Sequence, residues 1–348
     1  MIEQNISLKK YNTFGIDAIA QYFSVFNAVD QLSELLEFKK PPTSNLQLPV
    51  LILGGGSNIL FTKNFEGLVL KNEMQGIEKI KEDDTYMYVK AGAGVNWHQL
   101  VLFCIDNNWA GVENLSLIPG NVGASPMQNI GAYGVEIKDV FYELEAFHLT
   151  EKKIITFGLN DCAFGYRESV FKRKHRGEFV IMNVTYKLRK VPEYNTSYGA
   201  IEQELEKMGV KELSIRAISN AVINIRSSKL PNPAEIGNAG SFFKNPEISN
   251  DQFSILNAQF PNIVGYNLDN GNVKLAAGWL IEQCGPEKSG ASWKGFRNGD
   301  AGCHAKQALV LVNYGNATGK EIYSLSSEII ASVNKKFGVT LEREVDIV

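Results

Sequence analysis

The sequence of 348 residues has few cysteines and histidines, and neither type falls into a disulfide or metal-binding pattern. The four cysteines are far apart and form no C-x-x-C pair: Cys104, Cys162, Cys284 and Cys303. This spacing predicts reduced thiols in a cytoplasmic protein, and it excludes a disulfide framework or a zinc site. The four histidines, at positions 98, 148, 175 and 304, lack metal-ligand spacing, so we expect no structural metal.

Long apolar runs and a strong charge of one sign are also missing. No run approaches the ~18 residues that a membrane-spanning helix needs, and the first five residues lack the layout of a signal peptide. A net charge of −3 argues against nucleic acid as the main partner. A hydrophobic content of 44% and a charged content of 21% are typical of a globular protein, and the length allows two or three domains.

The two common nucleotide-binding signatures are absent as well. The chain contains no G-x-x-x-x-G-K-[ST] phosphate loop. A buried strand over 48–53 leads directly into Gly54-Gly55-Gly56-Ser57-Asn58, a backbone suited to close contact with a ligand. This turn lacks the G-x-G-x-x-G spacing and the helix of a dinucleotide fingerprint, so both familiar nucleotide folds are disfavoured.

A second segment rich in glycine, over 118–134, is the most informative part of the chain. It reads IPGNVGASPMQNIGAYG and lies between two strongly apolar regions. Glycine lets the backbone approach a ligand closely, and free N–H groups in such turns form anion-binding concavities. The segment therefore suits a pyrophosphate or a flat heterocycle. Its composition is equally consistent with an ordinary surface loop.

Strands alternate with helices along the whole chain, which predicts a mixed α+β fold. We expect helices that start after Asn96, Ser214 and Thr318, and one over 276–284. Strands are expected at 48–53, 86–90, 179–188, 308–312 and 339–348. A polar, turn-rich segment over 192–199 marks the preferred domain boundary. The prediction is a first domain over 1–190, with subdomains of about 1–70 and 71–190, and a second over 191–348.

Three other groups of residues carry polar side chains suited to catalysis or ligand binding, and each also has a purely structural interpretation. The first is Phe164-Gly165-Tyr166-Arg167-Glu168-Ser169, which is either an anion-binding loop or a solvated surface turn. The second pairs Arg226 and Lys229 at a helix C-terminus with a loop that presents Ser241 beside two phenylalanines; the alternative is that the two cations simply complement the helix dipole. The third is the terminal strand 341–347, where alternation places Glu342, Glu344 and Asp346 on a solvated face.

Together these segments resemble the family of UDP-N-acetylenolpyruvoylglucosamine reductases, flavoenzymes that complete UDP-N-acetylmuramate synthesis for peptidoglycan. The likeness covers nearly the whole chain in order, and any one motif alone would be weak. The segments that carry it are YNTFGI at 11–16, GGGSN at 54–58, the 118–134 segment, GYRES at 165–169, KLP at 229–231, GSFFKNP at 240–246, the 276–284 helix and LEREV at 341–345.

The resemblance implies non-covalently bound FAD in the fold of vanillyl-alcohol oxidase and p-cresol methylhydroxylase, with two α+β subdomains and a C-terminal α+β substrate-binding domain. In that fold the two glycine-rich turns wrap the pyrophosphate and the isoalloxazine. The residues that the resemblance assigns to the cofactor are Gly54, Gly55, Gly56, Ser57, Asn58, Pro119, Gly120, Gly123, Ala124, Ser125, Asn129 and Gly131.

The same resemblance assigns a catalytic trio, Arg167, Ser241 and Glu344. It assigns contacts with the nucleotide sugar to Tyr133, Tyr166, Arg226, Lys229, Asn245 and Gln307. Tyr198 matches the mobile-loop tyrosine of the longer subclass, which orders over the substrate diphosphate. The family usually has an arginine where Asp346 stands; if that arginine orients the glutamate, Glu344 has a changed neighbour here.

The implied reaction is NADPH-dependent reduction of UDP-N-acetylglucosamine enolpyruvate to UDP-N-acetylmuramate through FAD. Arg167 is expected to stabilise the enediolate of the substrate, Glu344 to hold or protonate the developing acid, and Ser241 to donate the final proton. The expected partners are this nucleotide sugar and NADPH, with no nucleic acid and no membrane, for a cytoplasmic monomer. Two alternatives stay open: a flavin oxidase of the same fold, and a nucleotide-sugar-binding relative without catalysis.

Overall fold

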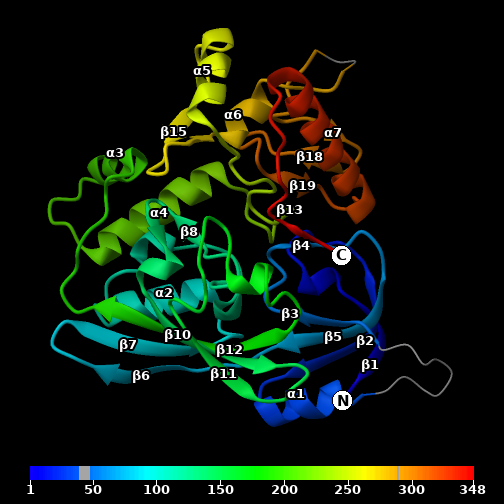
Figure 1. Ribbon diagram of the computed structural model, residues 1–348, viewed down its shortest axis with the longest axis vertical. Helices are drawn as coiled ribbons and strands as arrows, with labels where there is room; N and C mark the ends of the chain where they lie inside the picture. The colour runs from blue at the N-terminus through cyan, green and yellow to red at the C-terminus, as the bar shows by residue number, and fades with distance from the viewer. Residues whose placement is uncertain (39–47, 288–289) are drawn as a thin grey trace. The chain divides into compact units, whose positions relative to one another are not determined.

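The computed structural model describes residues 1–38, 48–287 and 290–348 (Figure 1). The chain folds into two compact units, each made of several stretches of sequence. The first unit contains Met1–Ile6, Ala20–Gly55 and Glu66–Ser228. The second contains Ser7–Ile19, Gly56–Phe65 and Lys229–Val348. The glycine-rich turn 54–58 therefore begins in one unit and ends in the other.

The first unit contains a four-stranded sheet in the order β1-β2-β5-β3. Its strands are β1 (Glu3–Ser7), β2 (Ile19–Phe26), β3 (Val50–Leu53) and β5 (Phe65–Asn72). Helix α1 (Val29–Leu36) buries Leu32 and Leu35 in the same apolar cluster as side chains from β2 and β5. The parallel pairing of β3 with β5 positions Gly54 at the end of a strand, as the sequence predicts.

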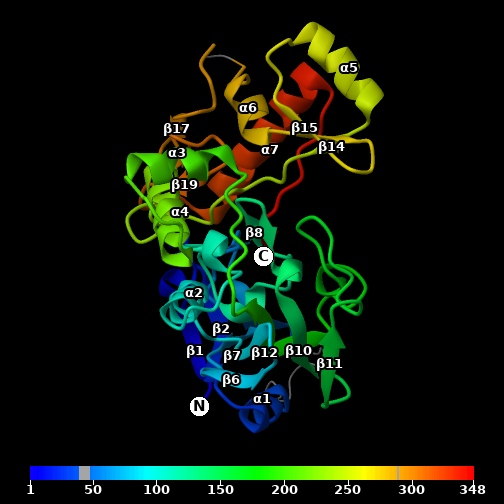
Figure 2. The same ribbon diagram turned by 90° about the vertical axis from the view of Figure 1, so that its left-hand side faces the viewer.

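The same unit has a five-stranded antiparallel sheet in the order β11-β10-β12-β7-β6, which Figure 2 shows side by side. Its strands are β6 (Ile77–Glu82), β7 (Tyr86–Gly92), β10 (Phe141–His148), β11 (Ile154–Gly158) and β12 (Phe179–Arg189). Helix α2 (Trp97–Asp106) follows β7, and its N-cap Asn96 accepts from the Gln99 N–H as predicted.

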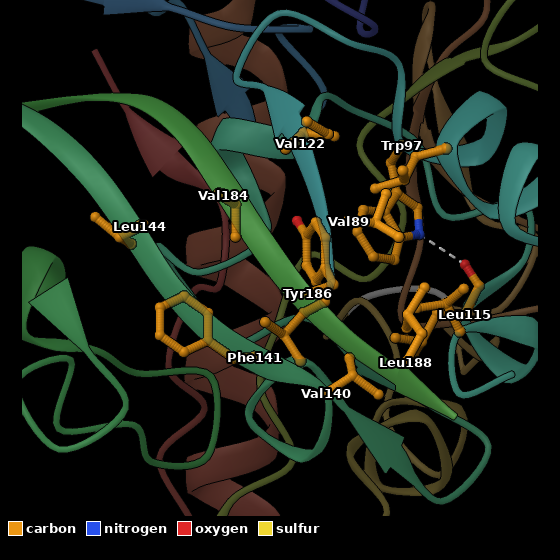
Figure 3. Close-up of a cluster of buried hydrophobic side chains, with 14 of the residues drawn as sticks. Val89, Trp97, Leu115, Val122, Val140, Phe141, Leu144, Val184, Tyr186 and Leu188 are labelled. Carbon is orange, nitrogen blue, oxygen red and sulfur yellow. Dashed lines mark hydrogen bonds between the residues drawn. The ribbon is translucent and has the colours of Figure 1, made fainter. Parts of the chain in front are cut away.

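The apolar core of the first unit anchors the buried part of the glycine-rich 118–134 segment (Figure 3). Trp97 is buried, its indole Nε1 donates to the Leu115 carbonyl oxygen at 2.8 Å, and its ring meets Tyr186 edge-on. The Tyr186 hydroxyl in turn lies 2.7 Å from the Ser125 hydroxyl. A buried aromatic pair with satisfied polar atoms therefore ties the 118–134 segment to β12 and α2.

Short turns and strands make up the 118–134 segment and its flanks, and two helices follow strand β12. Two 3₁₀ turns, η2 (Glu113–Leu115) and η3 (Val122–Ala124), precede the small hairpin of β8 (Gly131–Ala132) and β9 (Val135–Glu136). Helix α3 (Gly199–Lys207) and helix α4 (Ile215–Lys229) follow β12. Helix α4 starts where the sequence predicts, since Ser214 Oγ accepts from the Ala217 N–H at 3.1 Å.

The second unit has a four-stranded sheet in the order β13-β19-β18-β17 and a three-stranded sheet in the order β14-β16-β15. The strands are β13 (Gly237–Asn238), β14 (Glu247–Ile248), β15 (Gly265–Asn267), β16 (Val273–Leu275), β17 (Arg297–Asn298), β18 (Ala301–Cys303) and β19 (Leu311–Asn313). Its helices are η1 (Lys9–Tyr11), α5 (Asn250–Gln259), α6 (Ala277–Glu282) and α7 (Gly319–Phe337). The strand predicted over 308–312 is thus shifted, and the helix predicted over 276–284 is shorter.

Helix α7 has the ends that the sequence predicts. Thr318 and Glu321 form a reciprocal capping box, and Gly338 ends the helix with φ of 65°. The predicted strand over 339–348 is mostly wrong, because only β20 (Asp346–Ile347) is a strand, paired in parallel with β4 (Ile59–Leu60). The alternation holds in part: Val339, Leu341 and Val345 are buried as predicted, but Ile347 is exposed and Glu344 is half-buried.

All four cysteines are free and buried. Burial raises the pKa of the Cys162 and Cys303 thiols to about 12, so neither thiol is poised for reaction. In the parts of the chain that the structure describes, no helix is long and apolar enough to cross a membrane.

Candidate functional site

Gly54 and Gly55 stand where the turn after β3 meets the 118–134 segment, and they differ in what surrounds them. A Cβ on Gly55 would lie 2.9 Å from Asn121 Oδ1 and 3.0 Å from the α-carbon of Gly120, so the two glycine-rich turns touch through this position. A Cβ on Gly54 would meet nothing closer than the Asn121 Cβ at 4.0 Å. Packing explains Gly55, whereas the protein itself does not require Gly54 to be glycine.

The second half of this turn belongs to the second unit and is held by other contacts there. Gly56 has φ of 64°, and a Cβ on it would lie 2.0 Å from the Tyr11 carbonyl oxygen, so only glycine fits. Ser57 follows it. Asn58 donates from Nδ2 to the Glu344 carbonyl oxygen at 3.1 Å, and its own carbonyl accepts from the Asp346 N–H. The C-terminal segment is therefore fixed to the residues right after the glycines.

The cofactor residues predicted in 119–131 line one continuous turn. Pro119 and Gly120 lead into η3, which contains Gly123 and Ala124 and places Gly123 against Ala93, where a Cβ would come within 2.7 Å. Asn129 is buried with φ of 43°, and its Nδ2 donates to Glu136 Oε2 and to the Gly165 carbonyl oxygen, both at 3.0 Å. A non-glycine residue in this strained conformation persists because its side chain is held at both ends.

Arg167 is oriented by the end of this turn. Its Nη2 donates to the Gly131 carbonyl oxygen at 2.7 Å, and its guanidinium lies 5.5 Å from the centre of the Tyr166 ring. Arg167 also has a left-handed backbone, with φ of 54°. Arg167 thus lies against Gly131, Tyr166 lies beside Arg167, and the strain of the backbone is typical of a functional loop.

Arg226 and Tyr133 form a second charged group in this unit. Tyr133 is hydrogen-bonded to Arg226, and its ring meets the Tyr198 ring edge-on at 5.3 Å. Burial lowers the pKa of Arg226, and the neighbouring charge of Arg167 lowers it further. Among the residues that the structure describes, none forms a hydrogen bond with the buried Arg226 Nε. Two nearby guanidinium groups with a spare buried donor suit an anionic ligand.

In the second unit, Ser241 is exposed at the end of a well-anchored turn. Phe242 and Phe243, which follow it, are buried, and the Phe242 N–H donates to the Leu309 carbonyl oxygen at 2.7 Å. The Glu344 N–H donates to the Phe242 carbonyl oxygen at 2.8 Å. One backbone pairing therefore brings together the segments that carry Ser241 and Glu344, two members of the predicted trio.

Three predicted substrate residues also lie in or beside this unit. Asn245 Oδ1 accepts from the Ala277 N–H and so fixes the start of α6, and Gln307 Oε1 accepts from the Leu309 N–H at 3.2 Å. Both side chains stabilise turns, which keeps them ordered. Lys229 is the exposed last residue of α4. Asp346, the departure from the usual arginine, is exposed, and its backbone rather than its side chain makes the pairing with β4.

The residues present fit a flavin dinucleotide in the first unit. A Cβ at Gly54 would make only an ordinary contact with Asn121, so the absence of a side chain there is not explained by packing and suits close approach of a cofactor to the backbone. The adjoining turn supplies small residues, a strained Asn129 and backbone that only glycine follows at Gly120, where φ is 114°. The observed geometry thus agrees with a bound heterocycle or pyrophosphate near Gly54 and Gly120.

Two residues that support this site were not predicted from the sequence. Asn114 is buried in η2, and its Nδ2 donates to the carbonyl oxygens of Tyr133 and Asn195. His98 Nδ1 accepts from the Leu117 N–H at 3.0 Å, where Leu117 has φ of 59°. No local pattern singles out Asn114, because Glu113 and Ser116 in the same run are polar as well; its role follows from its burial, since buried polar groups must be paired.

Comparisons with known proteins cover both parts of the sequence. A family model described as FAD binding domain matches residues 28–155, and one described as UDP-N-acetylenolpyruvoylglucosamine reductase, C-terminal domain, matches residues 232–348. Proteins named UDP-N-acetylenolpyruvoylglucosamine reductase are 50% identical in Amoebophilus asiaticus, over 100% of this chain and 99% of the relative, and 48% identical in Flavobacterium johnsoniae, over the same shares.

A solved structure is similar along the whole chain. It is the UDP-N-acetylenolpyruvylglucosamine reductase of Thermus caldophilus, with a TM-score of 0.68 and 23% identity, over 100% of this chain and 98% of that one. At this identity the likeness concerns the fold.

Proposed function

Because this chain belongs to the UDP-N-acetylenolpyruvoylglucosamine reductase family, we propose that it reduces UDP-N-acetylglucosamine enolpyruvate to UDP-N-acetylmuramate for peptidoglycan synthesis. The predicted family, the α+β fold with an FAD-binding domain and the oxidoreductase activity are confirmed by the full-length relatives. The substrate is a nucleotide sugar. NADPH as the electron donor, a monomeric state and a cytoplasmic location belong to the proposal, as does a functional boundary near residue 190.

Within the structure, the observation that best supports this function is the buried, unpartnered Nε of Arg226 close to Arg167. A diphosphate brings two or more negative charges, and a guanidinium binds phosphate oxygens with directed N–H donors. Tyr133 adds aromatic and hydroxyl surface next to Arg226, and the Tyr198 ring lies against Tyr133. Tyr166, Lys229, Asn245 and Gln307 complete the proposed set of substrate-binding residues.

When bound, FAD would supply the hydride chemistry that links the electron donor to the enolpyruvyl double bond. The proposed cofactor residues are those of the two glycine-rich turns, with Gly54 and Gly55 at their contact. Ser125 and Asn129 would hold the second turn in shape through their bonds to Tyr186 and Gly165. Their part is to bind and orient the cofactor while excluding water from it.

Arg167 is proposed to stabilise the negative charge that develops on the carboxylate of the substrate. Its fixed bonds to the loop mean that little reorganisation is needed when charge appears, which is the basis of electrostatic catalysis. Ser241 would donate the proton that completes the reduction. A serine hydroxyl is a weak acid, but an enediolate is a very strong base, so this proton transfer is downhill. Glu344 would hold or protonate the developing acid.

The test is a turnover assay with purified protein saturated with FAD. NADPH oxidation should depend on added UDP-N-acetylglucosamine enolpyruvate, and UDP-N-acetylmuramate should form in equal amount. Oxygen consumption without the nucleotide sugar would instead indicate a flavin oxidase. Binding of the nucleotide sugar without any NADPH oxidation would indicate a relative that has lost catalysis.

A further inference from the structure

The buried side chain of Asn114 joins two segments of the first unit that are far apart in sequence. Its exposed fraction is 1%, and its amide Nδ2 donates to the Tyr133 carbonyl oxygen at 3.0 Å and to the Asn195 carbonyl oxygen at 2.9 Å. A side-chain amide has two N–H groups, so both are used. One side chain thus fixes the backbone of the β8–β9 hairpin and of the segment that leads from β12 to α3 (Figure 1).

A return contact closes this connection. Asn195 donates from its own Nδ2 to the Gly134 carbonyl oxygen at 3.1 Å, and its Oδ1 accepts from the Ser197 hydroxyl at 2.9 Å. Gly134 has φ of 81°, and a Cβ on it would lie 3.1 Å from Asn195 Nδ2. The hairpin and the 191–198 segment are therefore joined twice by side-chain amide hydrogen bonds, once through Asn114 and once directly from Asn195. We call this set, Asn114 with Asn195 and the carbonyls of Tyr133 and Gly134, the amide clamp.

The segment that the clamp holds has little support from apolar packing. Val191 has an exposed fraction of 77%, Tyr194 of 41% and Tyr198 of 50%. A cavity of about 770 Å³ is lined by residues 193–197 of this segment together with Tyr86, Lys187 and Arg189 from the sheet. A segment next to a cavity, with exposed aromatic rings, opens at low cost unless specific bonds hold it.

The clamp acts on the two tyrosines assigned to the substrate. It bonds the carbonyl oxygen of Tyr133, whose backbone is strained at φ of 51°, and it fixes the chain three residues before Tyr198. The Tyr133 ring contacts the Tyr198 ring and is bonded to Arg226. The position of the Tyr133 ring at Arg226, and of the Tyr198 ring against Tyr133, therefore depends on Asn114, whose side chain donates to two backbone carbonyls.

We propose that Asn114 is a positioning residue for the nucleotide sugar, holding the Tyr198 segment closed against Tyr133 through the amide clamp. The role of Asn114 in substrate binding rests on the proposed function, whereas the hydrogen bonds of the amide clamp do not depend on it. Asn114 acts through Tyr133 and Tyr198 on substrate binding. It has no part in the reduction of FAD by NADPH.

Asn114→Asp tests the proposal, because a carboxylate has the same shape but cannot donate to two carbonyls. Hydrogen–deuterium exchange on the FAD-loaded protein without substrate should show faster exchange in peptides covering 131–136 and 191–198. The KM for the nucleotide sugar should rise about tenfold, as expected for the loss of two buried hydrogen bonds. The rate of flavin reduction by NADPH alone should stay within about twofold.

Asn72→Asp is the matched control. Asn72 is also buried in the first unit, and its Nδ2 donates to a backbone carbonyl, that of Ile181, at 3.0 Å. This variant should lower Tm but leave exchange at 191–198 and the KM unchanged. Asn195→Ala, which removes the return bond to Gly134 and the bond from the Ser197 hydroxyl but keeps both bonds of Asn114, is a milder second variant. It should shift exchange and KM in the same direction as Asn114→Asp.

If hydrogen–deuterium exchange at 191–198 is unchanged in both Asn114→Asp and Asn195→Ala, the amide clamp does not hold this segment. A KM that does not rise, or equal losses in the Asn72→Asp control, would overturn the positioning role. If the wild-type protein shows no turnover with the nucleotide sugar, the proposed function fails, while the exchange experiment still decides whether Asn114 holds the segment.

Discussion

Arg167 donates from Nη2 to the carbonyl oxygen of Gly131 at 2.7 Å, and this bond decides where its remaining N–H groups point. The glycine is required there, since a Cβ on Gly131 would lie 3.2 Å from Arg167 Nη1 and 2.8 Å from the Glu136 side chain. The cofactor turn thus orients the proposed charge-stabilising side chain directly. Arg167 and the second turn are one structural group.

Arg167→Lys should lower kcat for the nucleotide sugar by about 10²–10³-fold, because lysine keeps the charge but not the fork that bonds Gly131 and substrate together. Reduction of FAD by NADPH should change far less. Stopped-flow measurement of the two half-reactions separates these effects. The control is Arg173→Lys, since Arg173 also donates to a backbone carbonyl, that of Ala163, from the exposed side of the loop. Similar losses in both variants would contradict the role of Arg167.

Ser241→Ala should leave flavin reduction by NADPH intact and block reoxidation by the nucleotide sugar, because only the second step needs a proton donor. The backbone turn should persist, since buried Phe242 and Phe243 hold it. Ser249→Ala provides a comparison: it removes the N-cap of α5 and should cost about 1 kcal/mol of stability without affecting either half-reaction. Equal loss of both half-reactions in Ser241→Ala would remove Ser241 from this role.

Gly54→Ala and Gly55→Ala should separate cofactor binding from folding. The Cβ at position 54 has room in the protein, so Tm of the cofactor-free protein should stay within about 1–2 °C while FAD dissociates more readily. The Cβ at position 55 collides with Gly120 and Asn121, so that variant should lose both stability and FAD. Calorimetry with and without FAD measures both. Tight FAD binding by Gly54→Ala would place the cofactor elsewhere.

His98→Asn should reveal a pH dependence at the start of the cofactor turn. Burial lowers the pKa of His98 below 6.5, and the charge of Arg226 lowers it further, so the folded state holds the ring neutral. Below pH 6.5 the unfolded chain therefore binds more protons at His98 than the folded protein does. The contribution of the neutral ring to stability is complete above pH 6.5 and is lost as the pH falls through the lowered pKa of the folded protein. Protonation also removes the acceptor for the Leu117 N–H.

Asparagine keeps an acceptor oxygen near the place of Nδ1 and does not titrate. The Tm of wild type should therefore fall relative to His98→Asn as pH is lowered from about 8 to about 5, and FAD retention should follow. His148→Asn is the control, because His148 Nδ1 accepts the Glu151 N–H in a surface turn. A constant Tm difference between wild type and His98→Asn across this range would contradict the prediction.

The helix and strand signals of the sequence are strongest where local chemistry decides. Asn96, Ser214 and Thr318 cap the helices that they are predicted to cap, because a side-chain oxygen satisfies a free N–H within three residues. The strand predicted over 339–348 is mostly wrong, because a strand depends on a partner strand that is distant in sequence. Its alternation is right for Val339, Leu341 and Val345 but not for Ile347, and most of that segment makes isolated contacts, such as Phe243 with Arg343, instead of a ladder. Alternation alone does not supply a neighbouring strand.

The sequence by itself determined the two glycine-rich turns, the family and the residues that the family assigns, since each is a matter of residue type and order. Only the tertiary structure decided how these residues are held. It divided the 54–58 turn between two compact units, left space at Gly54 but none at Gly55, and made Asn114 the link between Tyr133 and Asn195. Such contacts join residues up to 81 positions apart, and no local pattern encodes which distant backbone group a buried amide will meet.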